Sequence, residues 1–340
     1  MKSVCLCACA VLACESFAGP TFSFPEPDLD RWEYPFNTTT RGFRDQISTF
    51  SSLGQESIPP FTFDQRDGQF LIRFDADSQI ESGLTPCGYF IESAVIRAQI
   101  SNNNQFEYDE TYDDFTSYLP DGDPNQTADT DLGRPLELYG VGYRGGFTAG
   151  TFVEGTVLEA GTPFGSAIQS DSRFAYASDL RNGSDDDVSN NVRDGFDPLA
   201  FAIGTTGTVM PGQLVPFDTD FEFELDASNV DVQAYLREAL DSGDLMVVIT
   251  ALAPASSDGG PGSGSFASFY AKENFFGAPA SLEITLGEAS PGDVNLSGSV
   301  TFDDLISILF QFGRTNGLAD VDCSGLVDFS DLIATLFLFD

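Results

Sequence analysis

The sequence predicts a mainly β protein, with a β-sandwich or jelly-roll body followed by a small α-helical module at the C-terminus. Short runs rich in β-branched and aromatic residues recur between about residues 22 and 286. The 33 glycines and 18 prolines of the chain supply turns between such runs. The tail differs, because GDVNLSGSVTFDDLISILFQFG from Gly292 is nearly repeated as ADVDCSGLVDFSDLIATLFLFD from Ala319.

The first 18 residues have the composition of a secretory signal peptide. One lysine, a short apolar run and small residues lead to Ala18, so we expect the mature chain to span residues 19–340. The alternative is a lipoprotein signal, because VLAC would place a lipidated cysteine at Cys14. The apolar run is too short to span a bilayer, and no other segment is long and apolar enough. The sequence therefore predicts a secreted or cell-surface protein without a transmembrane segment.

Residues 19–288 are assigned to the β body. The expected strands are QFLIRFD from Gln69, SAVIRAQI from Ser93, PLELYGVGY from Pro135, DFEFELDA from Asp220 and LMVVITAL from Leu245. The stretch SFYAKENFFGAPASLEITL resembles a final strand pair. The Gly- and Ser-rich residues 255–265 before it are therefore interpreted as a loop.

One helix is expected within the body, in NVDVQAYLREALDSGD. Asn229 or Asp231 would cap its start and Gly243 would end it. Its apolar face would contain Val232, Tyr235, Leu236 and Leu240.

The charge of the chain excludes several classes of partner. It has 53 acidic and 15 basic residues, which give a formal net charge of −38. Binding to nucleic acid needs clustered cations, so a nucleic-acid partner is not expected. An anionic membrane surface is disfavoured for the same reason. An acidic surface suits divalent cations and neutral or cationic ligands, although it also suits solubility in a salty medium.

The chain contains no histidine, which excludes Ser-His-Asp and Cys-His nucleophilic chemistry and every His-ligated metal site. Catalysis would depend on carboxylates, tyrosine, arginine or a bound ion. Candidate carboxylates are Asp75, Glu92, Glu107 and Glu137, but no local motif pairs any of them. We therefore expect a non-catalytic protein and leave the catalytic residues unassigned.

Two cysteines remain after the predicted leader is removed, Cys87 and Cys323. A disulfide between them could form in an exported protein, but their positions in the sequence do not establish that they lie close together. The acidic loop around Asp121, Asp123 and Asn125 has alternate oxygen ligands, but Gln126 replaces the glycine of a calcium loop. We interpret it as a solvated acidic loop.

The repeated tail segments, within residues 289–340, match the spacing of a twelve-residue calcium loop. Such a loop takes oxygens from positions 1, 3, 5, 7, 9 and 12 and needs glycine at position 6, which Gly298 and Gly325 provide. Calcium prefers an all-oxygen set, whereas zinc would favour histidine or cysteine. We therefore predict two calcium ions. The expected ligands are Asp293, Asn295, Ser297, Ser299 and Asp304 in the first loop, and Asp320, Asp322, Ser324, Leu326 and Asp331 in the second.

Each loop should lead into a short amphipathic helix. Asp304 and Asp331 lie in its first turn, where a carboxylate favours the helix dipole. The apolar positions repeat in the two helices, so we expect the helices to bury these faces against each other. They are Leu305, Ile306, Leu309 and Phe310, repeated as Leu332, Ile333, Leu336 and Phe337.

These two loop–helix units resemble the type I dockerin module over about residues 292–340. The resemblance implies calcium-dependent folding and docking to a cohesin-like protein, usually in polysaccharide-degrading assemblies. The tail departs from the dockerin pattern in three ways. Ser297 and Ser324 replace the commoner acidic ligand. The recognition positions hold the pairs Phe302-Asp303 and Phe329-Ser330 in place of small hydroxyl residues, and late basic residues are missing apart from Arg314.

The body is similar, through motifs of low specificity, to DNRLRE-type jelly rolls and to exported proteins of planctomycete-like bacteria. This similarity spans about residues 45–286 and rests on RDGQFLIRFD, IESAVIRAQI, LELYGVGYR and SFYAKENFFGAPASLEIT. It implies a carbohydrate- or surface-binding domain linked to extracellular polysaccharide use. Two alternatives remain open: a secreted polysaccharide hydrolase or lyase carrying a dockerin, and a structural matrix protein made rigid by calcium.

Overall fold

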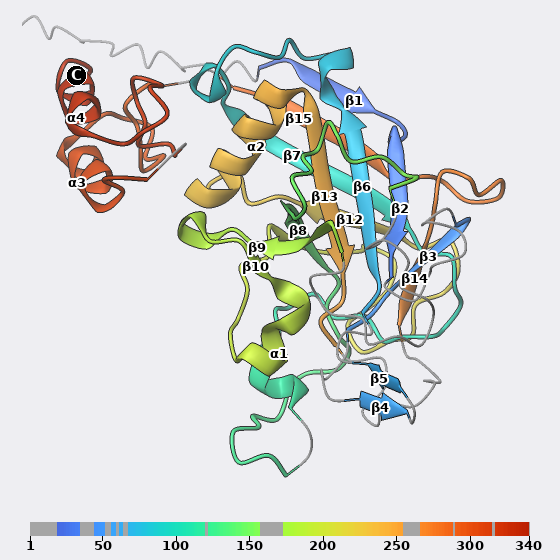
Figure 1. Cartoon of the computed structure of the whole chain (residues 1–340). Coiled ribbons are helices and arrows are strands. Elements are labelled where there is room, and N and C mark those ends of the chain that lie inside the picture. The colour runs from blue at the N-terminus through green and yellow to red at the C-terminus, as the bar shows by residue number, and fades with distance from the viewer. Residues whose placement is uncertain are drawn as a thin grey trace, which may run out of the picture.

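Figure 1 shows the computed structural model of the chain. It describes residues 19–34, 44–51, 56–58, 61–63, 67–119, 122–156, 173–253, 266–287, 290–314 and 317–339. The predicted signal peptide, the predicted loop at 255–265, Asp121 and the boundary between body and tail lie outside these residues. None of the helices in the described ranges has the length and apolar character needed to cross a bilayer.

The prediction of a mainly β protein is confirmed, and so are the five expected strands and the helix. The strands are β1 (Thr21–Phe24), β2 (Leu29–Glu33), β3 (Gln46–Thr49), β4 (Glu56–Ile58), β5 (Phe61–Phe63), β6 (Gln69–Asp75), β7 (Ile91–Gln99), β8 (Glu137–Tyr143), β9 (Ala175–Asp179), β10 (Asp186–Asp187), β11 (Ala202–Ile203), β12 (Asp220–Glu224), β13 (Asp244–Thr250), β14 (Ala267–Tyr270) and β15 (Ser281–Leu286). The α-helices are α1 (Asn191–Asp194), α2 (Val230–Ser242), α3 (Phe302–Phe310) and α4 (Phe329–Leu336).

Most strands belong to two antiparallel sheets. The smaller sheet has the order β1-β15-β7-β12, and the larger has the order β10-β9-β8-β13-β6-β2, with β11 added beside β8. Side chains from both sheets meet in one hydrophobic core, including Ile96 and Phe221 from the smaller sheet and Phe70 and Val247 from the larger. The two sheets therefore share their main apolar interior.

The larger sheet is buried on both faces. Along β6, Phe70, Ile72 and Phe74 enter the core shared with the smaller sheet, while Leu71 enters a second apolar cluster on the opposite face. This second cluster also holds Phe152, from the segment that follows β8. Burial on both faces explains the uninterrupted apolar runs at residues 70–72 of β6 and 245–249 of β13.

The final strand pair expected from the sequence does not form. β14 and β15 are both present, but β14 pairs with β3, while β15 pairs with β1 and β7. The connection between β14 and β15 carries the chain from one sheet to another. Sequence adjacency suggested a hairpin, and pairing with strands distant in sequence prevailed.

Helix α2 starts and ends where the sequence predicts. The Asn229 side chain accepts hydrogen bonds from the backbone N–H groups of Asp231 and Val232 at the N-terminus. Gly243 ends the helix in the left-handed conformation, with φ of 85°. Val232 and Leu236 are fully buried in the shared core. In Figure 1, α2 lies between the sheets and the tail helices α3 and α4.

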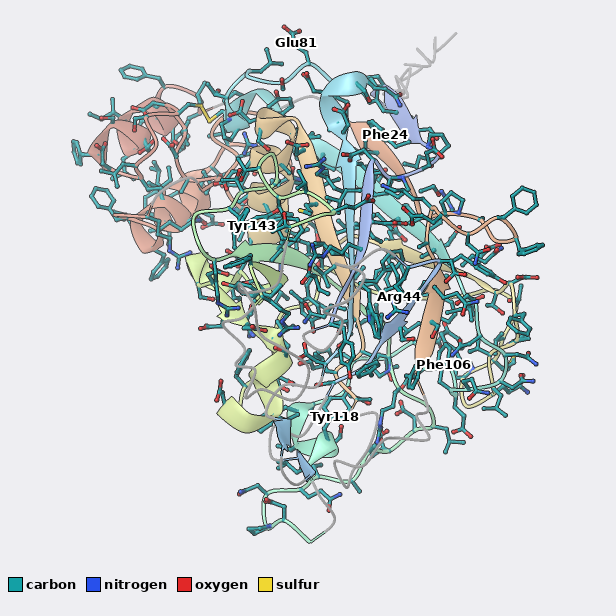
Figure 2. All side chains as sticks on the ribbon, turned by 45° about the vertical axis from the view of Figure 1, so that its right-hand side comes forward. Phe24, Arg44, Glu81, Phe106, Tyr118 and Tyr143 are labelled. Atoms are coloured by element: carbon teal, nitrogen blue, oxygen red, sulfur yellow. A yellow bond between two sulfur atoms is a disulfide. The ribbon has the colours of Figure 1, made fainter. Side chains whose placement is uncertain are left out.

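The tail is joined covalently to the body by a disulfide between Cys87 and Cys323, which are 236 residues apart in sequence. Figure 2 shows this bond in yellow, between the tail and the rest of the molecule. Cys87 lies in a short 3-10 turn, Pro86–Gly88, and Arg237 of α2 donates a hydrogen bond to the Pro86 carbonyl oxygen. The pairing that the sequence left open is therefore present in the structure.

Candidate metal centre

The second tail loop brings its predicted acidic ligands together. Each of Asp320, Asp322 and Asp331 contributes one carboxylate oxygen, and these three oxygens lie within 4.8 Å of one another. Such a group could hold a metal ion. Asp331 is fully buried, and its two oxygens accept hydrogen bonds from the backbone N–H groups of Asp322 (3.1 Å) and Asp328 (2.7 Å). The carboxylate at position 12 thus fastens the start and the end of the loop to each other.

The first loop repeats the hydrogen bonds made by the aspartate at position 12. Asp304 is also fully buried, and it accepts hydrogen bonds from the backbone N–H groups of Val294 (2.8 Å), Asn295 (3.1 Å) and Thr301 (2.7 Å). Asp293 accepts from the backbone N–H of Gly298 at 2.7 Å, as Asp320 does from Gly325. The two halves of the duplicated sequence therefore fold in the same way.

The oxygen groups expected at positions 5 and 7 are also adjacent in both loops. Ser297 Oγ donates to the Ser299 carbonyl oxygen at 3.2 Å, and Ser324 Oγ donates to the Leu326 carbonyl oxygen at 3.2 Å. The intervening glycines have φ values of 86° at Gly298 and 87° at Gly325, in the left-handed region that glycine adopts readily. Both loops therefore make the sharp turn that an oxygen cage requires.

The second loop concentrates negative charge. Burial raises the pKa of Asp320, against the backbone N–H groups of Gly325 and Ser324, which favour its charged form. The nearby carboxylates of Asp331 and Asp322 act in the same direction as burial. A bound cation would relieve this repulsion, because it compensates all three charges at once.

The expected burial of the helix faces is only partly correct. Leu305 and Ile308 of α3 are buried, but Phe310 is 82% exposed, and its counterpart Phe337, which follows the last residue of α4, is 85% exposed. Also exposed are Phe302, Leu309, Phe329, Ile333 and Leu336. The small core is filled largely from the loops, by Val294, Leu318, Ala319 and Val327, with Val230 of α2 packed against it. Helices of 9 and 8 residues are too short to cover the remaining apolar side chains.

The four candidate catalytic carboxylates do not form a site. Asp75, Glu92 and Glu107 are exposed and come from separate segments, whereas Glu137 is fully buried in β8. Within the described ranges, no hydrogen bond or ion pair joins any two of these four residues. The structure therefore provides no carboxylate pair for hydrolysis from this set.

Glu137 makes the stability of the fold depend on pH. Burial raises its pKa from 4.5 to about 8, and the Asp113 carboxylate adds to the shift, while Tyr139 and the Leu252 backbone favour the charged form less strongly. Between these two pKa values the folded chain keeps a proton that the unfolded chain releases. The contribution of protonated Glu137 to the free energy of unfolding is therefore fully present below about pH 4.5. It is lost as the pH rises towards about 8.

We expect Glu137→Gln to remove this pH dependence. The free energy of unfolding of the variant, relative to the wild type, should increase by up to about 1.4 kcal/mol for each pH unit within the window. Denaturant unfolding at pH 5 and pH 8 measures the difference, with the exposed Glu92→Gln as control. A difference that stays constant with pH would show that Glu137 is not protonated in the folded chain.

Two further acidic clusters, which sequence reasoning missed, lie in the body: Asp30, Glu154 and Glu273 form one, and Asp109, Asp113 and Asp131 form the other. Asp109 and Asp113 lie in an acidic stretch that is evident in the sequence. Their proximity to Asp131, however, depends on the fold. The predicted loop around Asp123 and Asn125 forms a turn, in which Asp123 accepts a hydrogen bond from the Asn125 backbone.

A scan against protein-family models and a search of curated proteins both found no match to the chain. Several acidic clusters of the described chain could hold a metal ion.

Proposed function

We propose that the chain is an exported calcium-binding protein with a dockerin-type docking module in its tail. Its body, interpreted as a jelly-roll-like β-sandwich, would bind carbohydrate or another surface without catalysis, in the context of extracellular polysaccharide use. The observation that carries the proposal is the duplicated loop in which a buried aspartate, Asp304 or Asp331, fastens the start of the loop to the start of the following helix.

Calcium is the proposed ion because the predicted ligands are all oxygen atoms of carboxylate, amide, hydroxyl and carbonyl groups. Two ions are proposed because both loops share one hydrogen-bond pattern. Ser297 and Ser324 stand where a further charge would strengthen binding, so we expect weak sites, with dissociation constants on the order of 10⁻⁴–10⁻³ M, as in extracellular modules. The disulfide supports export, because such bonds persist in oxidising compartments.

Exposed apolar side chains support a docking role for the tail. Phe302, Phe310, Phe329 and Phe337 are between 66% and 85% exposed, although a soluble module normally buries most side chains of this kind. The four phenylalanines occupy equivalent positions in the two halves of the repeat. A cohesin-like domain is the proposed partner.

Replacing Phe302 and Phe329 together by alanine should weaken docking at least ~10-fold, because each ring would lose buried contact area in the complex. Calorimetric titration against a panel of purified type I cohesin domains, with calcium and with EDTA, measures this. Phe275→Ala is the matched control, since Phe275 is 92% exposed but lies in the body. No binding to any cohesin in calcium would exclude this class of partner.

The body offers one candidate contact surface for a polysaccharide. Phe275 and Phe276 are 92% and 89% exposed and form an edge-to-face pair with ring centroids 5.5 Å apart. The Asn274 side chain holds the turn that carries them, by accepting hydrogen bonds from the backbone N–H groups of Phe276 and Gly277. Aromatic faces presented in this way can pack against the apolar faces of sugar rings.

A glycan array probed with the mature chain tests this part of the proposal, and the same polysaccharides should be screened for cleavage. Binding that is lost in Phe275→Ala/Phe276→Ala and kept in Phe302→Ala is the expected result. Release of reducing ends or unsaturated sugars would favour the hydrolase or lyase alternative. Absence of both binding and cleavage would favour a structural protein made rigid by calcium.

A further inference from the structure

The connection between β7 and β8 contains an acidic cluster made by Asp109, Asp113 and Asp131. One carboxylate oxygen from each of these residues lies within 4.8 Å of the others. Asp109 and Asp113 are 2% and 5% exposed, whereas Asp131 is exposed to solvent. The cluster thus has a buried base and one side open to solvent, which is the form of a site that a small ion can enter.

A buried oxygen of this cluster lacks a hydrogen-bond donor. Asp109 Oδ1 accepts from the backbone N–H of Thr111 at 2.8 Å and from its hydroxyl at 2.7 Å, but Asp109 Oδ2 is buried without any hydrogen-bond partner. A buried carboxylate oxygen without a donor is destabilising, because it has lost its hydration and gained nothing in return. This atom therefore lacks the hydrogen-bond donor or cation that would compensate its burial.

The surroundings of the Thr111 hydroxyl group also contain too few hydrogen-bond donors for the carboxylate oxygens present. It lies 2.7 Å from Asp109 Oδ1 and 2.9 Å from Asp131 Oδ2, yet it has a single proton to donate. One of these two short oxygen–oxygen contacts is therefore left without a hydrogen. A cation between the carboxylates would make both contacts favourable.

Arginine compensates only part of the negative charge. Arg134 Nη1 contacts Asp113 Oδ2 at 3.1 Å and also forms an ion pair with Asp129, which itself accepts a hydrogen bond from the Asp131 backbone N–H. Arg134 therefore forms ion pairs with Asp113 and Asp129, whereas Asp109 and Asp131 have no ion pair among the described residues. The cluster of Asp30, Glu154 and Glu273 differs, because the ammonium group of Lys272 pairs with Glu154 and the Lys272 backbone N–H donates to Asp30.

We infer that Asp109, Asp113 and Asp131 bind a calcium ion in the body, separate from the two loops of the tail. Calcium accepts carboxylate oxygens at 2.3–2.6 Å in irregular arrangements, so one ion can bridge oxygens up to about 5 Å apart. Magnesium holds its ligands at 2.0–2.1 Å in a strict octahedron and fits this spread less well. Water completes the coordination on the open side, next to Asp131.

This ion would fix the long connection between β7 and β8 against the larger sheet. Asp113 lies two residues before the 3-10 turn η3 (Phe115–Tyr118), and Tyr118 packs in the apolar cluster on that sheet. Figure 2 shows Tyr118 at the end of the molecule opposite the tail, so this site and the tail loops can be tested independently.

Counting bound calcium in the full mature chain tests the inference. Equilibrium dialysis over free calcium concentrations of about 10⁻⁵–10⁻² M should show one bound ion fewer in Asp131→Asn than in the wild type. The Asp131 side chain is exposed, so this variant should fold normally, as circular dichroism can verify. Asp109→Asn should lose the same ion, whereas the control Glu283→Gln, an exposed carboxylate on β15, should lose none.

The outcomes separate this site from the proposed tail sites. Three ions in the wild type and two in Asp131→Asn support both sites, and one ion falling to none supports the body site without the tail sites. An unchanged count in Asp131→Asn and Asp109→Asn, with both variants folded, overturns the inference. A wild-type chain that binds no calcium overturns it as well.

Discussion

Removing calcium from a chain of residues 19–340 should abolish most of the helical structure of residues 290–340 while leaving the sheets of the body intact. The tail has a small apolar core of its own, centred on Val294, Ile308 and Val327. A core of this size cannot hold a module of about fifty residues by itself, so the bound ions would have to supply part of the free energy of folding. Circular dichroism before and after EDTA, with calorimetric calcium titration, measures the effect.

Single substitutions at position 12 should have the largest effects within the tail. Asp304→Ala or Asp331→Ala removes an expected ligand and also the acceptor of two or three backbone hydrogen bonds. Each should eliminate one ion from the titration and loosen the helix that follows. Asp303→Ala is the matched control, because Asp303 is exposed beside Asp304 in the first turn of α3.

The opposite result would be informative. A tail that is equally helical with calcium and with EDTA, and that gives no heat of calcium binding, would mean that the duplicated sequence folds as a plain helical hairpin. In that case the backbone hydrogen bonds of Asp304 and Asp331 would suffice to close the loops. The docking proposal would then lose its calcium dependence.

Replacing Cys87 and Cys323 together by serine should uncouple the tail from the body. The disulfide closes a loop across 236 positions, and restricting such a loop in the unfolded chain contributes up to about 5 kcal/mol in the chain-entropy model. We expect the wild type to unfold in one transition by scanning calorimetry. The variant should show a separate transition of the tail at lower temperature.

The same variant should bind calcium more weakly at the second loop. Cys323 occupies position 4 of this loop, between Asp322 and Ser324, so the disulfide restrains the backbone that carries two expected ligands. The first loop contains no cysteine and serves as the internal reference. A variant with unchanged transitions and unchanged calcium affinities would show that the contacts of α2 with the tail hold the two parts together without the covalent bond.

Local features of this protein could be predicted from its sequence, because their causes are local. Asn229 and Gly243 mark the ends of α2 through capping and the left-handed conformation, which depend only on neighbouring residues. The runs that form β6 and β13 are apolar because both faces of their sheet are buried. In the tail, the expected ligands of a loop lie within twelve residues, and the structure brings Asp320, Asp322 and Asp331 of the second loop together.

Features that depend on distant parts of the chain were not predictable. β14 pairs with β3 across more than two hundred residues, and no local signal selects that partner. Asp131 joins Asp109 and Asp113 only because the chain folds back between β7 and β8. The exposure of Phe310 and Phe337 was missed because helical periodicity indicates an apolar face but does not reveal how much protein is available to cover it.

The bond between Cys87 and Cys323 also determines how the molecule would respond to mechanical tension. A pull between the two ends of the mature chain passes from Cys87 to Cys323 through the disulfide. Residues 88–322, which include most of both sheets and the first tail loop, lie outside this covalent path, and β15 and β13 take up load only through their pairing with β1 and β6. Only β1 to β6 at one end, and the rest of the second loop with α4 at the other, could be extended. A chain held at residue 19 and at its tail would therefore stretch only to a limited length.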